Sequence, residues 1–121
     1  MIESVRFVGS RTVALAEMAA LYDALGLEPV LEQPGATWFR TADGTSIHLY
    51  AGDDADHDFF GTGPVVGFHV ADFERARAAL VAAGAEFIGE PQRDGGSIWN
   101  HYRAPDGNVY EIVGRDPEAG A

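Results

Sequence analysis

The sequence has neither cysteine nor lysine among its 121 residues. The lack of cysteine excludes disulfide bonds, thiol catalysis and thiolate metal ligands. Because eight arginines stand against 19 acidic residues, the basic clusters that contact phosphates are missing, and we expect no nucleic acid partner. Phosphate-binding loops, nucleophile elbows and dinucleotide-binding fingerprints are absent too.

Long apolar runs are also missing from the chain. No run reaches the ~18 residues of a membrane span, so we expect no membrane association. The first residues do not combine a basic segment with an apolar one, so no signal peptide is predicted. These two absences favour a cytoplasmic location.

What the sequence does contain is an excess of negative charge, −11 at pH 7, in an otherwise ordinary composition. Its apolar share of 46% and charged share of 22% are typical of a soluble globular protein, and its length fits a single domain. The negative charge could attract a cationic ligand over long range, or it could serve only to keep the protein soluble.

Periodicity and turn signals predict the order βαβββ twice. The first module, about residues 1–50, has strands at 2–9, 28–33, 37–41 and 45–50 and a helix at 14–25. The second, about residues 64–115, has strands at 64–70, 85–89, 97–103 and 108–114 and a helix at 73–83 that Asp72 caps. A polar, acidic linker (51–63) separates them, residues 92–96 are expected to form a loop, and the tail (116–121) should fray.

A sequence repeat supports the two modules. Residues 39–44 (Phe-Arg-Thr-Ala-Asp-Gly) align with residues 102–107 (Tyr-Arg-Ala-Pro-Asp-Gly) at an offset of 63, which places His48 on Glu111. Near the start of each module, Phe7 falls on His69. Glu111 is unusual because it is a carboxylate inside a strand of β-forming residues, where a charged side chain needs a partner.

Two segments carry a resemblance to a known family. Residues 66–76 (Val-Gly-Phe-His-Val-Ala-Asp-Phe-Glu-Arg-Ala) and 103–111 (Arg-Ala-Pro-Asp-Gly-Asn-Val-Tyr-Glu) resemble the vicinal oxygen chelate superfamily. It includes glyoxalases, extradiol dioxygenases, fosfomycin resistance enzymes and bleomycin resistance proteins. The resemblance covers nearly the whole chain. It implies an α+β fold, in which two tandem βαβββ modules form a mixed sheet curled around a shared cup for a divalent metal or a ligand.

The resemblance also implies a metal centre. In metal-binding members the ligands come from the first and last strand of each module, which are the positions of Phe7, His48, His69 and Glu111. Phe7 cannot bind a metal, and His48 stands where the family more often has Glu. The other three would hold Fe, Mn, Zn or Ni. The residues alone leave other roles open: His69 as a hydrogen-bonded core residue, Glu111 as neutral or paired with His69, and His48 as a surface residue.

His101 is the candidate general acid or base. Strand pairing across the turn at 104–108 could set His101 beside Glu111, and related dioxygenases resemble this arrangement with an acid–base residue at the matching position. The alternative is a surface histidine in the hairpin. His57, in the acidic linker, is expected to be solvated.

Four aromatic residues are candidate ligand contacts, although core packing is the default role of aromatic side chains. Phe7, at the vacant ligand position, would narrow the cup and make it more apolar. Trp38, at the repeat position of His101, would line the same cup. The other two, Trp99 and Tyr102, belong to the second hairpin.

Two functions are therefore predicted for a small-molecule ligand. The first is a divalent-metal-dependent lyase, isomerase or dioxygenase acting on a small oxygen-rich substrate, in which His101 moves the proton. The second is a metal-free binding protein of the bleomycin resistance type, which holds a cationic molecule in an acidic, aromatic groove. The negative charge and Phe7 suit the second, whereas His48 and His69 suit the first. Both imply a homodimer.

Overall fold

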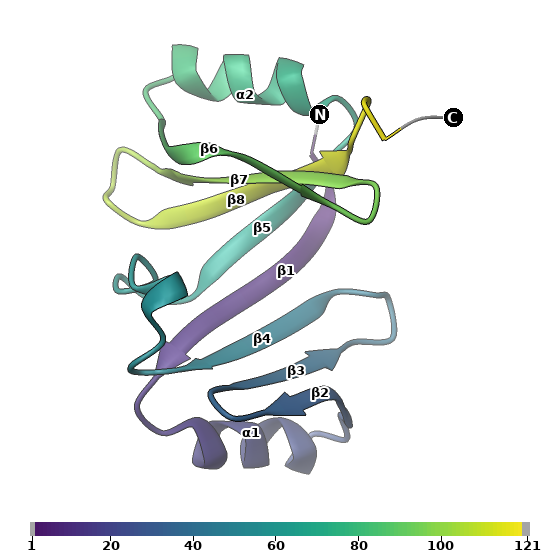
Figure 1. The fold of residues 1–121 in the computed structure, drawn as a ribbon, viewed down its shortest axis with the longest axis vertical. Coiled ribbons are helices and arrows are strands. Elements are labelled where there is room, and N and C mark those ends of the chain that lie inside the picture. The colour runs from purple at the N-terminus through teal and green to yellow at the C-terminus, as the bar shows by residue number, and fades with distance from the viewer. Residues whose placement is uncertain (1, 120–121) are drawn as a thin grey trace. The chain divides into compact units, whose positions relative to one another are not determined.

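The computed structural model describes residues 2–119, and its elements follow the predicted order (Figure 1). The first half contains β1 (Ile2–Thr12), α1 (Leu15–Ala24), β2 (Pro29–Gln33), β3 (Ala36–Arg40), β4 (Ser46–Ala51) and a short 3₁₀ helix, η1 (Ala55–His57). The second contains β5 (Val65–Val70), α2 (Phe73–Ala82), β6 (Glu86–Asp94), β7 (Ser97–Arg103) and β8 (Val109–Arg115). This βαβββ order, occurring twice, confirms the predicted α+β fold class.

The eight strands form one mixed sheet in the order β2-β3-β4-β1-β5-β8-β7-β6. The chain divides into two compact units, here called the first unit (residues 7–65) and the second unit (residues up to 6 together with those from 66 on). The long strand β1 therefore contributes its C-terminal part to the first unit and its N-terminal part to the second. No helix within residues 2–119 has the length and apolar character needed to cross a membrane.

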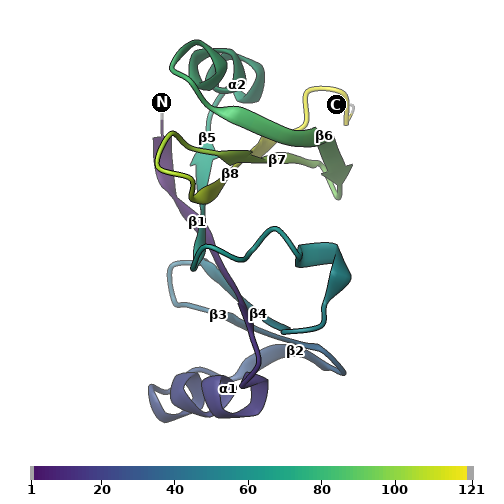
Figure 2. The same ribbon diagram turned by 90° about the vertical axis from the view of Figure 1, so that its left-hand side faces the viewer.

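In the first unit, α1 and the segment after β4 lie on opposite faces of the sheet (Figure 2). Strand β4 pairs antiparallel with β3 and parallel with β1. On the helix side, Tyr22 of α1 packs on Phe39 at 5.4 Å between ring centroids. Phe39 and Leu49 are fully buried, and burial of such side chains stabilises the unit by about 2 kcal/mol each.

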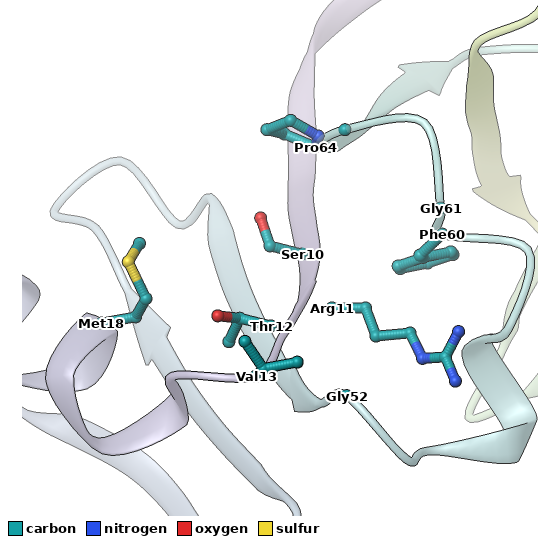
Figure 3. Close-up of a pocket in the computed structure, with 10 residues that line it drawn as sticks. Ser10, Arg11, Thr12, Val13, Met18, Gly52, Phe60, Gly61 and Pro64 are labelled. Atoms are coloured by element: carbon teal, nitrogen blue, oxygen red, sulfur yellow. The ribbon is translucent and has the colours of Figure 1, made fainter.

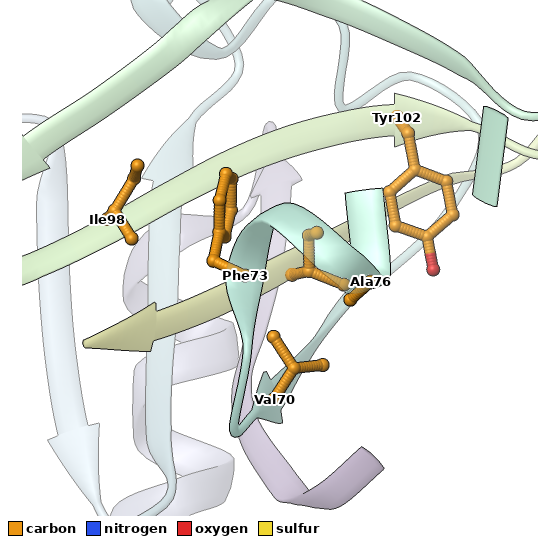
Figure 4. Packing of buried hydrophobic residues seen from close by; sticks show 6 residues of the cluster. Val70, Phe73, Ala76, Ile98 and Tyr102 are labelled. Atoms are coloured by element: carbon orange, nitrogen blue, oxygen red, sulfur yellow. The ribbon is translucent and has the colours of Figure 1, made fainter. Parts of the chain in front are cut away.

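In the second unit, α2 packs against β7 and β8 around a core that Figure 4 shows from close by. The core consists of buried residues from α2, β7, β8 and the end of β5: Val70, Phe73, Ala76, Ile98, Tyr102 and Ile112. The carboxylate of Asp72 accepts a hydrogen bond from the Arg75 N–H at 3.1 Å, which confirms the predicted helix cap.

Strand β6 is longer than predicted, and the expected loop at residues 92–96 is wrong for its first part. The strand continues to Asp94 through a bulge between Ile88 and Gln92. Gly89, with a φ of 71°, adopts the left-handed conformation at that bulge, and Pro91 follows. Glycine and proline so close together indicate a strand end, but here the bulge absorbs both and pairing with β7 resumes.

The residues after β8 are anchored as far as the structure describes them. Asp116 is buried, accepts a hydrogen bond from Arg93 Nε at 3.3 Å, and donates its backbone N–H to the Gly96 carbonyl at 2.8 Å. The prediction of a frayed tail also covers residues 120–121, which lie outside the described part of the chain.

Candidate ligand-binding site

Two hairpins position the candidate residues in equivalent ways. Strands β3 and β4 pair Trp38 with His48, and strands β7 and β8 pair His101 with Glu111. Each hairpin therefore places one predicted site residue directly opposite another on the same sheet face. The sequence predicts the pair of His101 and Glu111, and the repeat places Trp38 and His48 at the equivalent positions.

The turns of these hairpins are also equivalent. The Thr41 N–H donates to the Thr45 carbonyl and the Ala104 N–H donates to the Asn108 carbonyl, each at 2.9 Å. Gly107 has a φ of 88° in the second turn, a conformation that a side chain would strain. The shared Asp-Gly sequence thus fixes the register that sets the two pairs.

His48 lies inside an aromatic cluster of the first unit. Its ring stacks on Trp38 with 3.9 Å between centroids and an interplanar angle of 4°. Phe7 meets His48 edge-on at 4.8 Å. The His48 Nδ1 atom is 2.9 Å from the Tyr50 hydroxyl. The predicted site residues Phe7, Trp38 and His48 are therefore brought together, and Tyr50 joins them.

The environment of His48 disfavours its charged form. Burial, followed by the repulsion from His57 and Arg40, lowers the pKa of His48 from 6.5 to about 4. The imidazole is therefore neutral at pH 7, and its hydrogen bond with Tyr50 joins two uncharged groups.

The segment after β4 folds back onto this cluster. His57 stacks on Tyr50 with 3.6 Å between ring centroids, and its Nδ1 is 3.1 Å from an oxygen of Asp54. Phe60 is buried, with 3% of its surface exposed. His57 is therefore half-buried against Tyr50 rather than fully solvated. The pair Phe59 and Phe60 in an otherwise acidic stretch could have indicated that this segment packs on the protein. Phenylalanine side chains are usually buried.

A pocket of about 520 Å³ opens beside the cluster. Three aromatic side chains and three carboxylates line it, together with the turn between β2 and β3: Trp38, Tyr50, His57, Asp53, Asp54, Asp56 and residues 33–36. The buried Trp38 Nε1–H makes no hydrogen bond with any residue within 2–119. Sequence reasoning did not single out the three aspartates, although it noted their acidic segment.

A second cavity of the first unit, of about 500 Å³, follows the end of β1 (Figure 3). It includes Ser10, Arg11 and Met18 but none of the predicted site residues. Arg11 donates from Nη1 to the Asp58 carbonyl at 3.4 Å, so its guanidinium helps to hold the folded-back segment.

His101 and Glu111 form a close pair in the second unit. The His101 Nε2 and Glu111 Oε2 atoms are 2.9 Å apart. Only 8% of the surface of Glu111 is exposed, so histidine is the partner that a carboxylate inside a strand requires. The prediction that strand pairing sets these residues side by side is confirmed.

The remaining predicted residues of the second unit have other neighbours. His69 lies on β5, and its Nδ1 is 2.8 Å from an oxygen of Glu3 on β1. Trp99 donates from Nε1 to Gln92 at 2.9 Å. Tyr102 belongs to the core beneath α2. Because side chains alternate along a strand, Tyr102 lies on the opposite sheet face from His101.

These contacts decide how well the chain fits a metal. Each of the three implied ligands has a protein partner: His48 has Tyr50, His69 has Glu3 and Glu111 has His101. Within residues 2–119, no three histidine, aspartate or glutamate side chains are grouped so that they could hold a metal ion. A metal ion would therefore have to replace these partners as it bound.

The fold and these hairpins agree with comparisons to known proteins. A model of the Glyoxalase/Bleomycin resistance protein/Dioxygenase superfamily matches residues 7–112. The chain therefore belongs to this superfamily. No curated protein sequence matches the chain.

Three solved structures illustrate the likeness. The chain is similar to the Mn(II)-bound glyoxalase from Novosphingobium aromaticivorans, with 23% identity and a TM-score of 0.74 over 93% of this chain and 39% of that one. It is similar to methylmalonyl-CoA epimerase from Mycobacterium tuberculosis, with 21% identity and a TM-score of 0.66 over 97% and 91%. It is similar to BphC, a halotolerant catechol dioxygenase, with 18% identity and a TM-score of 0.69 over 98% and 42%. These identities support the shared fold alone.

Proposed function

We propose that the chain is a metal-free binding protein for small cationic molecules that carry an aromatic ring, and that the pocket beside Trp38 is the binding site. The observation that carries this proposal is the composition of the pocket. Aromatic rings of Trp38, Tyr50 and His57 share one cavity with the carboxylates of Asp53, Asp54 and Asp56.

Each of these groups has a defined part in the binding of a cation. The face of an aromatic ring attracts a quaternary or protonated amine. The exposed carboxylates of Asp53 and Asp56 add attraction at the rim, and the net charge of −11 steers cations toward the protein.

The simplest test uses benzyltrimethylammonium, an aromatic cation, and reads binding from tryptophan fluorescence. The chain has two tryptophans, so Trp99→Phe leaves Trp38 as the sole reporter. We expect a saturable change in Trp38 emission with benzyltrimethylammonium and none with the anion benzenesulfonate. No saturable change with the cation would contradict the proposal.

The matched protein carries Trp38→Phe and reports from Trp99. Because Trp99 lies in the other unit and bonds to Gln92, its emission is expected to stay unchanged when the cation is added. Equal changes in the two single-tryptophan proteins would indicate non-specific association rather than a site at Trp38.

The second candidate function is an enzyme of the lyase, isomerase or dioxygenase type. The 2.9 Å contact between His101 and the buried Glu111 favours it, because a carboxylate that orients a histidine is a common proton-transfer arrangement. We would test turnover of methylmalonyl-CoA and of catechol, with and without added Fe, Mn, Zn or Ni. If either is turned over, His101→Gln should lower the rate at least about a hundredfold, while circular dichroism shows that the fold is retained.

A further inference from the structure

The second unit contains an apolar pocket to which neither candidate function assigns a role. It has a volume of about 310 Å³ and lies between the end of α2 and the turn that joins β7 to β8. Phe68, Tyr102 and Tyr110 form its aromatic wall, and small or rigid side chains that include Ala83, Ala104 and Pro105 face them. Because this is the sheet face beneath α2, it is the face opposite His101 and Glu111.

The rings of the aromatic wall are stacked on one another. The Phe68 and Tyr110 rings are 6.3 Å apart with an interplanar angle of 14°, and the Tyr110 and Tyr102 rings are 5.9 Å apart at 24°. The slot beside these nearly parallel rings suits a planar group, which can extend the stack. The alanines opposite provide the space, because any larger side chain there would fill it.

One polar group in this pocket lacks a protein partner. Tyr102 is 94% buried, since only 6% of its surface is exposed, yet its hydroxyl makes no hydrogen bond with the residues that the structure describes. Burial, together with the neighbouring Tyr110, raises the pKa of Tyr102. The hydroxyl therefore stays protonated and can donate a hydrogen bond to a molecule in the pocket that it lines.

We propose that this pocket binds a neutral, planar and mainly apolar molecule with one hydrogen-bond-accepting oxygen, of the aryl ketone or aryl ester class. The volume falls at the small end of ligand pockets. No charged side chain lines the pocket, so it offers nothing to a cation or an anion. This ligand differs in charge from that of the Trp38 pocket, and the inference stands independently of the function proposed there.

The test uses the full chain with ¹³C-labelled alanine methyl groups and acetophenone as the probe. We expect acetophenone at millimolar concentration to shift the methyl signals of Ala83, Ala85 and Ala104 in a saturable way. Ethylbenzene, which lacks the oxygen, should bind more weakly, and benzoate should not bind. Absence of saturable shifts at these three methyl groups would overturn the inference.

Two variants test the contributions of the slot and of the Tyr102 hydroxyl to binding separately. Tyr102→Phe keeps the ring, so it should weaken acetophenone binding roughly two- to tenfold and leave ethylbenzene binding unchanged. Ala104→Leu should fill the slot and abolish binding of both, with circular dichroism showing that the fold is retained. If Tyr102→Phe binds acetophenone as well as the parent does, the assignment of the hydroxyl is overturned.

Discussion

Gly9 determines how closely the aromatic rings of the first unit can pack. A Cβ atom at this position would lie 2.3 Å from Phe7 Cζ and 2.8 Å from Phe60 Cε2. Gly9→Ala should therefore lower the free energy of unfolding by about 1–3 kcal/mol, measured by urea denaturation. Gly61→Ala is the matched control, because the nearest atom to a Cβ there is 3.8 Å away. Equal effects of the two substitutions would contradict the packing that we describe.

His48 makes the stability of the protein depend on pH. The unfolded chain protonates this histidine near pH 6.5, whereas the folded protein resists protonation until about pH 4. The contribution of His48 to stability is therefore complete above pH 6.5 and declines as the pH falls toward 4, by up to about 3 kcal/mol.

This prediction is measured by comparing urea unfolding near pH 7 and near pH 4 in the parent and in His48→Phe. The phenyl ring keeps the stacking position on Trp38 but cannot be protonated, so the variant should lose less stability on acidification. The difference between the two proteins removes the titration of the carboxylates that they share. An identical loss in both would show that His48 is not the group responsible.

At the scale of elements, the hairpin of β7 and β8 depends on the pair of His101 and Glu111. His101→Phe leaves the buried carboxylate without its partner and should cost about 3 kcal/mol of unfolding free energy. The apolar double variant His101→Phe/Glu111→Leu should recover most of that loss, since no uncompensated charge stays buried. Additive losses in a double-mutant cycle would contradict a coupled pair.

Much of this element-level structure could be predicted from local sequence. The Asp-Gly turns and the alternation of strands specify the hairpin register, and register alone places His101 beside Glu111 and Trp38 beside His48. The Asp72 cap likewise follows from a local signal. These predictions succeed because the interacting residues are separated by one tight turn.

The rest depends on contacts between distant residues. His69 pairs with Glu3, 66 residues earlier, and nothing in either local sequence indicates that pairing. The segment with His57 and Phe60 carries polar and acidic residues typical of a linker, but its two phenylalanines bring it onto Tyr50. The extension of β6 could not be predicted from the sequence, because glycine and proline occur both at bulges and at the ends of strands.

At the scale of the whole molecule, we expect a homodimer. The chain spans 39% of the glyoxalase and 42% of the catechol dioxygenase that it resembles, so two copies would supply a comparable number of modules. Size-exclusion chromatography with light scattering should give twice the chain mass of 12.9 kDa. A mass of one chain at every concentration would contradict the prediction.

Isothermal titration calorimetry with benzyltrimethylammonium measures directly whether the acidic, aromatic pocket of the first unit binds cations. Asp53→Asn/Asp56→Asn removes rim charges but leaves the contact between Asp54 and His57 in place. This variant should bind the cation roughly three- to tenfold more weakly, with a loss that shrinks at high salt.

Its control is Glu86→Gln/Glu90→Gln, which removes the same charge from exposed positions of β6 in the second unit. We expect this control to bind the cation as the parent does. Equal weakening in both variants, or no measurable binding by the parent protein, would contradict the proposed site.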